Sequence, residues 1–315
     1  MKIVFAGSDP RSPIPFRALR EAGFCVAAVL TQPDKPTGRK RILTPNPMKV
    51  AAQDAGVPVF DFARVRDHAA ALAAVGADCM VTCAYGQILT VDVLAAFPRG
   101  VFNVHTSLLP RWRGASPIQS AIWAGDAETG VTIMRTELGL DTGDVLLRAR
   151  LPIEETDTAG TLADKLFALG AACIVTALTQ VEQGTETYEK QNEADATFCK
   201  KIKKEDGALD FTGSARQLCR LVRAMDPEPL AFTRCGGKLV NILSAVPAEG
   251  AAGACGEVVR ADKTGIYVAA GDGCLCIRAL QFEGGKRLSA ADAVNGRKVC
   301  VGDVFGAGGA DGGGR

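Results

Sequence analysis

Short apolar runs alternate with amphipathic, helix-like stretches through the first half of the chain. Strands that are buried on both faces read as continuous apolar runs, and parallel strands need crossover connections that are usually helical. The alternation therefore predicts an α/β fold with a parallel-rich sheet covered on both faces. The expected strands span residues 2–6, 24–30, 57–60, 78–84 and 101–104.

The pattern in the second half of the chain predicts a long helix followed by a domain built mainly of β-strands. Apolar positions at helical spacing indicate a helix over 158–181, which begins at a cap provided by Asp157 or Thr158. A helix over 214–225 and short alternating runs over 238–246, 256–259, 265–270 and 274–282 favour a small barrel. We therefore expect a domain over 1–181, a polar linker over 182–206, a barrel domain over 207–305 and a flexible glycine-rich tail over 306–315.

Composition narrows the class of protein. The chain has 315 residues, 47% of them hydrophobic, and none of its apolar runs approaches the roughly 20 residues that span a bilayer. Residues 1–7 read as a buried strand rather than a signal peptide. Eleven cysteines scattered through apolar strings suit reduced thiols better than a disulfide framework. We expect a cytoplasmic protein with no membrane partner.

Two common cofactor motifs are missing from the sequence. Gly7 and Ser8 follow the first strand, but the dinucleotide pattern G-x-G-x-x-G is absent, as is the phosphate loop G-x-x-x-x-G-K-[ST]. Cys274 and Cys276 lack a second Cys/His pair at ligand spacing. We therefore expect neither a nicotinamide cofactor nor a metal.

The net charge of +1 means that any contact with nucleic acid must come from a local patch. Residues 34–49 carry five basic side chains against one acidic side chain. All but Lys49 lie in a loop over 31–48 that prolines and a glycine make too broken for helix or strand, and loops of this length are often functional. The run of lysines over 200–204 is a second candidate. Solvated loop charges are the alternative for both segments.

The candidate chemistry begins with Asn103 and His105, which share one face at the carboxyl end of an expected strand. Ligands of open α/β sheets bind at that edge. An asparagine amide can donate to a developing oxyanion, and a histidine can carry a proton near neutrality. The alternative is that the histidine has a structural role and only makes a hydrogen bond at the end of the strand.

Two further segments extend this pair. The loop over 107–115 places Leu108, Leu109 and Pro110 beside the histidine, as an apolar wall for a flat ring or as ordinary packing, and a helix is expected from Pro117 to near Gly125. Asp141 begins a glycine-bearing turn before an expected strand over 145–150. Its carboxylate would orient the imidazole, whereas an Asp in a turn is more often a turn residue.

These motifs together resemble the folate-dependent formyltransferases, and the whole chain is most similar to members that formylate methionyl-tRNA. The matching segments include Asn-Val-His-Thr-Ser-Leu-Leu-Pro at 103–110 and Leu-Asp-Thr-Gly-Asp at 140–144. Further matching segments span 5–8, 31–39, 84–89, 111–115 and 125–134. The spacing between His105 and Asp141 also fits the family.

The resemblance implies a Rossmann-like formyltransferase domain followed by an OB-like barrel. It implies an enzyme of translation initiation, with 10-formyltetrahydrofolate as donor, the α-amine of charged initiator tRNA as acceptor and no metal. We also expect a monomer. Asn103, His105 and Asp141 take the catalytic positions of the family. Ser107, Leu108, Leu109 and Pro110 take its folate-binding positions, and Lys35, Arg39, Lys40 and Arg41 take its tRNA-binding positions.

The chain departs from the family pattern at three places. Ser8-Asp9-Pro10 replaces Thr-Pro-Asp/Glu, the loop around Gly38 is about one residue shorter, and Glu228 stands where an aromatic residue is expected. Two other functions fit part of the pattern. A formyltransferase of an amino sugar nucleotide or another small amine would have the same three reactive side chains. A non-catalytic tRNA-binding protein would not need them.

Overall fold

The computed structural model describes residues 1–37, 42–250 and 253–306, and the chain divides into two compact units. The first unit comprises Met1–Pro117, Glu128–Pro152 and Ala163–Lys200, and the second comprises Ile118–Ala127, Ile153–Leu162 and Lys201–Arg315. The expected flexible tail lies outside the described residues, apart from Gly306.

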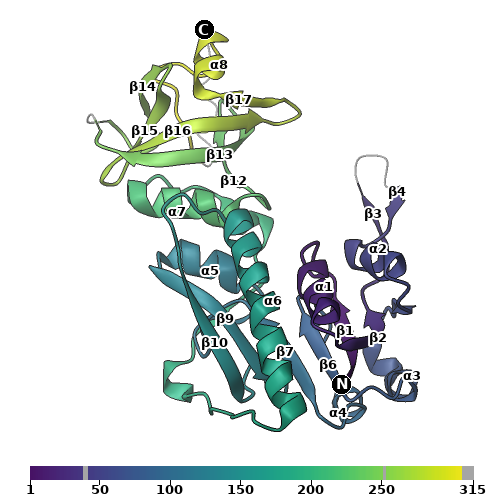
Figure 1. The fold of residues 1–315 in the computed structure, drawn as a ribbon. Helices are drawn as coiled ribbons and strands as arrows, with labels where there is room; N and C mark the ends of the chain where they lie inside the picture. The colour runs from purple at the N-terminus through teal and green to yellow at the C-terminus, as the bar shows by residue number, and fades with distance from the viewer. Residues whose placement is uncertain (38–41, 251–252, 307–315) are drawn as a thin grey trace. The chain divides into compact units, whose positions relative to one another are not determined.

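A seven-stranded sheet in the order β10-β9-β7-β6-β1-β2-β5 forms the centre of the first unit (Figure 1). Strands β5, β2, β1, β6 and β7 run parallel, whereas β9 pairs antiparallel with both β7 and β10. The expected parallel-rich sheet is confirmed, and it is a mixed sheet at one edge. The strands are β1 (Lys2–Gly7), β2 (Cys25–Leu30), β5 (Val59–Phe60), β6 (Cys79–Cys83), β7 (Val101–His105), β9 (Glu128–Arg135) and β10 (Val145–Pro152).

Helices cover both faces of this sheet. Alternate residues of β1 point to opposite faces: Val4 belongs to the buried cluster that includes Leu72 and Val93, whereas the ring of Phe5 lies 5.8 Å from that of Phe16. The helices of this unit are α1 (Pro13–Glu21), α2 (Pro47–Asp54), α3 (Ala69–Ala74), α4 (Val91–Ala95) and most of α6 (Ala159–Gln183), with 3₁₀ turns at η1 (Val65–Asp67) and η2 (Glu193–Asp195). Helix α5 (Pro117–Ala124), apart from its first residue, and the 3₁₀ turn η3 (Lys204–Gly207) belong to the second unit.

The expected helix over 158–181 is α6. By length and composition alone it is apolar enough to cross a membrane, but 56% of its most apolar stretch is buried within the protein. Gly170 allows close packing on the sheet, because a Cβ atom there would lie 2.7 Å from Val104 of β7. This helix therefore has the contacts of a core helix.

The expectation of an irregular loop over 31–48 is wrong. Residues Lys35–Thr37 (β3) and Ile42–Thr44 (β4) form a two-stranded antiparallel sheet in which Lys35 pairs with Thr44. A proline is tolerated in β3 because a strand at an edge need not donate every N–H group. Residues 38–41 lie outside the described part of the chain.

The second unit contains an antiparallel sheet in the order β12-β13-β16-β15-β14, with β17 paired to β16. The expected helix over 214–225 is α7 (Ala215–Met225), whose N-terminus is capped by Ser214. Val304 bridges Glu257 beside β14, and Phe305 bridges Cys235 of β12, so this returning segment contacts both ends of the strand order. The strands are β12 (Ala231–Cys235), β13 (Lys238–Ala248), β14 (Val258–Asp262), β15 (Gly265–Ala270), β16 (Gly273–Phe282) and β17 (Arg287–Ser289), followed by α8 (Ala290–Asn295).

Candidate active site

Strand β7 carries the first two candidate residues at its carboxyl end. It lies between β6, with Asn103 opposite Thr82, and β9, with His105 opposite Thr132. Because side chains two residues apart share a face of a strand, Asn103 and His105 project from the same side of the sheet. This is the arrangement that the sequence predicts.

The carboxamide of Asn103 is oriented by a neighbouring strand. The Thr82 hydroxyl donates a hydrogen bond of 2.8 Å to Oδ1 of Asn103. Among the described residues, no protein acceptor is paired with the Nδ2 group of Asn103. A carboxamide held by its oxygen presents its N–H groups in a fixed direction, which suits a donor to a developing oxyanion.

The imidazole of His105 is buried, and one of its nitrogens is committed to the backbone. Its Nε2 atom lies 2.9 Å from the carbonyl oxygen of Trp112. A carbonyl can only accept, so Nε2 carries the hydrogen and Nδ1 is the nitrogen left for proton transfer. His105 thus forms a hydrogen bond with the backbone, which was the structural role considered as the alternative to catalysis. Its Nδ1 atom remains available for proton transfer.

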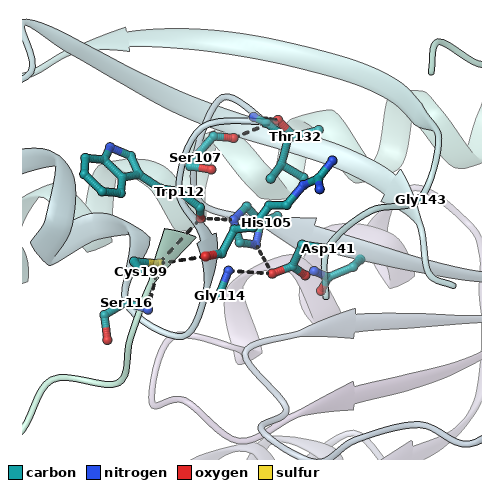
Figure 2. A network of polar contacts seen from close by, with 12 residues as sticks. His105, Ser107, Trp112, Gly114, Ser116, Thr132, Asp141, Gly143 and Cys199 are labelled. Carbon is teal, nitrogen blue, oxygen red and sulfur yellow. Dashed lines mark hydrogen bonds and ion pairs between the residues drawn. The ribbon is translucent and has the colours of Figure 1, made fainter. Parts of the chain in front are cut away.

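Asp141 faces that second nitrogen. Its Oδ2 atom lies 3.8 Å from Nδ1 of His105, which is longer than a hydrogen bond, and accepts a hydrogen bond of 2.8 Å from the N–H of Gly114 (Figure 2). Asp141 has a left-handed backbone with φ of +52°. The structure therefore brings two of the three predicted residues to one point, from segments 36 residues apart in the chain.

The side chain of Thr132 in β9 holds the loop after His105 through two hydrogen bonds. The fully buried hydroxyl of this residue donates to the carbonyl of Ser107 and accepts from the N–H of Leu109. Ser107 and Leu109 are themselves buried, whereas Leu108 and Pro110 are only partly buried. Of the four expected folate-binding residues, two therefore have clear packing roles, and the other two retain accessible apolar surface.

A second segment, not singled out by the sequence, supports the same loop. We call residues 189–199 the supporting segment. The N–H of Trp112 donates to the hydroxyl of Thr197, and that of Arg113 donates to the carbonyl of Thr197. Its last residues form β11 (Phe198–Cys199), which pairs in parallel with β8 (Arg113–Gly114). Part of the stretch expected to be a linker thus packs on the candidate catalytic loop.

Arg113 is the largest fully buried side chain of the described residues. Its guanidinium makes two parallel hydrogen bonds to the carboxylate of Glu193, at 2.8 and 2.7 Å, and also donates to Gln191. The hydrogen bond from Arg113 lowers the pKa of the Glu193 carboxyl below its ordinary value of 4.5. The sequence contains no local signal for this contact, because its partners are 78 and 80 residues apart.

The basic patch is partly neutralised. The ammonium of Lys49 lies 2.9 Å from the carboxylates of both Asp34 and Asp61, and these hydrogen bonds raise its pKa. Lys35 donates to Oε1 of Gln32 and remains exposed. Three of the four predicted tRNA-binding residues, Arg39, Lys40 and Arg41, lie outside the described residues.

The described residues contain no group of three or more His, Cys, Asp or Glu side chains that could hold a metal ion. All eleven cysteines are free thiols. Burial raises the pKa of both Cys79 and Cys219 to about 12, so these thiols stay protonated at neutral pH.

Comparison with solved structures shows the same fold in several enzymes. HypX from Aquifex aeolicus, in complex with tetrahydrofolic acid, is 19% identical with a TM-score of 0.66 over 92% of this chain. The match covers 46% of HypX, so this chain spans about half of its length. The N-formyltransferase from Helicobacter canadensis, in complex with folinic acid and dTDP-3-aminofucose, is 16% identical with a TM-score of 0.68, over 91% of this chain and 100% of that one. Methionyl-tRNA formyltransferase from Clostridium thermocellum is 16% identical with a TM-score of 0.55, over 79% and 94%.

Family models match both units. The formyl transferase model matches residues 1–178, which include Asn103, His105 and Asp141, and the model of the formyl transferase C-terminal domain matches residues 201–298. The chain is a member of the formyl transferase family.

Proposed function

We propose that this protein transfers the formyl group of 10-formyltetrahydrofolate to an amine, with Asn103, His105 and Asp141 as its catalytic residues. One observation carries the proposal: the Trp112 carbonyl fixes the tautomer of His105 and turns its Nδ1 atom toward the Asp141 carboxylate at 3.8 Å. That gap is too long for a direct hydrogen bond and leaves both groups available to a reacting atom.

The reaction needs one bond made, one bond broken and one proton moved. The neutral amine attacks the formyl carbon, and the tetrahedral oxyanion is stabilised by the Asn103 amide and by protonated His105. The bond between the carbon and N10 of the folate then breaks. The proton that the amine loses is relayed with the help of Asp141 to N10, so the products are a formamide and tetrahydrofolate. No metal is needed for these steps.

The folate donor is held next to this group by residues 107–110. The accessible apolar surface of Leu108 and Pro110 supports this assignment, because a pterin ring stacks on apolar side chains while its edges need polar partners. In this proposal the buried Ser107 and Leu109 set the path of the loop rather than contact the donor.

For the acceptor we propose the α-amine of methionyl-tRNA in translation initiation, in the cytoplasm. The segment 35–41 contains four basic residues, Lys35, Arg39, Lys40 and Arg41, which suit a phosphate backbone. In this proposal residues 1–181 are the catalytic domain and 182–206 connect it to an OB-like barrel over 207–305. The bridges made by Val304 and Phe305 support the closure of that barrel.

The experiment is a direct comparison of acceptors. Wild-type protein is incubated with 10-formyltetrahydrofolate and either charged initiator tRNA or a dTDP-linked amino sugar, and both tetrahydrofolate release and the formylated amine are measured. Formylation of the aminoacyl group supports the proposal. Transfer to the sugar alone would reassign the acceptor and keep the chemistry. Tight tRNA binding without any tetrahydrofolate release would contradict the proposal and indicate a non-catalytic tRNA-binding protein.

A further inference from the structure

The side chain of Gln191 joins two parts of the site that are far apart in sequence. Its Oε1 atom accepts from Nε and Nη2 of Arg113, at 3.1 and 2.9 Å. Its Nε2 group donates to the carbonyl oxygens of Asp141 and Gly143, each at 2.8 Å. One carboxamide thus makes four hydrogen bonds, which is close to its full capacity.

These partners allow only one orientation of the carboxamide. A guanidinium can only donate and a peptide carbonyl can only accept. If the amide were turned over, Oε1 would face two carbonyl oxygens and the NH₂ group would face the guanidinium of Arg113. All four contacts would then be repulsive, so the amide of Gln191 is locked.

The turn that Gln191 holds is a strained one. Asp141 has φ of +52°, a left-handed conformation that is unfavourable for most residues with a side chain. Gly143 has no room for a side chain, because a Cβ atom there would lie 1.7 Å from the carbonyl oxygen of Arg135. Hydrogen bonds to the carbonyls of residues 141 and 143 fix the turn on both sides of Thr142.

The Oε1 atom of Gln191 contacts Arg113, whose side chain is itself held in place. The side chain of Arg113 is only 1% exposed, and its bidentate contact with Glu193 fixes the plane of the guanidinium. Gln191 and Glu193 both belong to the supporting segment, whose Thr197 also holds the Trp112 peptide that orients His105. One segment therefore fixes the position of both Asp141 and its partner.

We propose that Gln191 is a positioning residue that holds the Asp141 carboxylate opposite Nδ1 of His105 for catalysis. This inference rests on the proposed function. Gln191 does not touch the reacting atoms and acts only through the Asp141 turn.

Two substitutions of equal length separate positioning from general support. Gln191→Glu keeps an oxygen for Arg113 but replaces the two N–H donors with a second oxygen that faces the carbonyls. Gln191→Met removes the contacts on both sides. Asn192→Ala is the matched control, because this neighbour bonds only within the supporting segment, to Ala194 and Asp195.

Both Gln191 variants should lower kcat for formyl transfer by about 10- to 100-fold, since a misplacement near 1 Å has effects of this size. KM for the donor should stay unchanged, because the lost contact matters mainly in the transition state. Asn192→Ala should keep the wild-type kcat. Wild-type kcat in a folded Gln191→Glu protein would overturn the inference. Should that variant fail to fold, Gln191→Met carries the same test.

A double-mutant comparison tests the route of the effect. If Gln191 acts through Asp141, adding Gln191→Glu to Asp141→Asn should cause little further loss of kcat. A full multiplication of the two losses would show an independent role and overturn the inference.

A readout without substrate keeps this inference separate from the proposed function. The chain has only two histidines, so NMR of labelled histidine rings reports His105 and His68 individually. Both Gln191 variants should shift the His105 signals and leave those of His68 unchanged, and unmoved His105 signals would refute positioning. Absence of formyl transfer by the wild-type protein would instead refute the proposed function alone.

Discussion

The backbone N–H of Gly114 donates a hydrogen bond of 2.8 Å to Oδ2 of Asp141, and this contact ties the loop after β7 to the turn before β10. Gly114 can make it because its φ of +119° lies in a region that favours glycine. A Cβ atom at this position would lie 2.2 Å from the carbonyl oxygen of Cys199. The same residue is therefore needed both for a close approach of two backbones and for the position of the Asp141 carboxylate.

Gly114→Ala should lower both stability and activity. The clash with the Cys199 carbonyl and the unfavourable φ should lower the free energy of unfolding by about 3 kcal/mol, measured by chemical denaturation. Gly184→Ala is the control, since Gly184 also has a positive φ but no heavy atom of the described residues within 4 Å of the added Cβ. It should cost about 1 kcal/mol. Equal effects in the two variants would contradict the role of the close approach.

His105→Ala should lose formyl transfer by a factor of about 10² to 10⁴ while the protein stays folded, because the protonated imidazole that stabilises the oxyanion is removed. The rate is measured under single-turnover conditions, and folding is checked by thermal melting. His68→Ala is the control for loss of a histidine, as the ring of His68 stacks on Phe62 instead. Near-normal turnover by His105→Ala would withdraw the assignment of His105.

Thr82→Val should lower kcat less than Asn103→Ala. The first variant removes the hydroxyl that orients the Asn103 carboxamide, whereas the second removes the oxyanion donor itself, which is worth about 10² to 10³ in rate. Both rates are measured at saturating donor and acceptor. An equal or larger loss in Thr82→Val would mean that Asn103 does not act as the donor.

The stability of the supporting segment should depend on pH through Glu193. Because Arg113 lowers the pKa of this carboxyl, its contribution is fully present above its ordinary value of 4.5 and is lost as the pH falls through the lower value in the folded protein. The wild type should therefore be more stable than Glu193→Gln at pH 7, and the difference should vanish in acid. Denaturation curves of both proteins across this range measure it, and a difference that persists in acid would contradict the ion pair.

Neutralising Arg39 and Arg41 together should weaken the binding of charged tRNA and flatten its dependence on salt, because fewer counterions are released. The double variant Arg64→Ala/Arg66→Ala is the charge-matched control. Both of its arginines are exposed in the same unit, with side-chain exposures of 66% and 57%. Equal salt dependence in the two double variants would mean that Arg39 and Arg41 are solvated charges that do not contact tRNA.

Some parts of this structure are determined locally and can be predicted from sequence. Continuous apolar runs define β1, β6 and β7, and helical spacing with a cap defines α6 and α7. Alternation along β7 then places Asn103 and His105 on one face. The proline-rich hairpin was missed because pairing between β3 and β4 outweighs the weak strand propensity of Pro36.

The sequence by itself determined the α/β class, the two-part organisation and the candidate catalytic residues, because these follow from periodicity and from motifs within short segments. Only the tertiary structure decided the tautomer of His105, the approach of Asp141 and the contacts of Gln191 and Arg113. Those contacts join residues from 7 to 80 positions apart. A hydrogen bond between such partners depends on the path of the whole chain, and no local pattern records it.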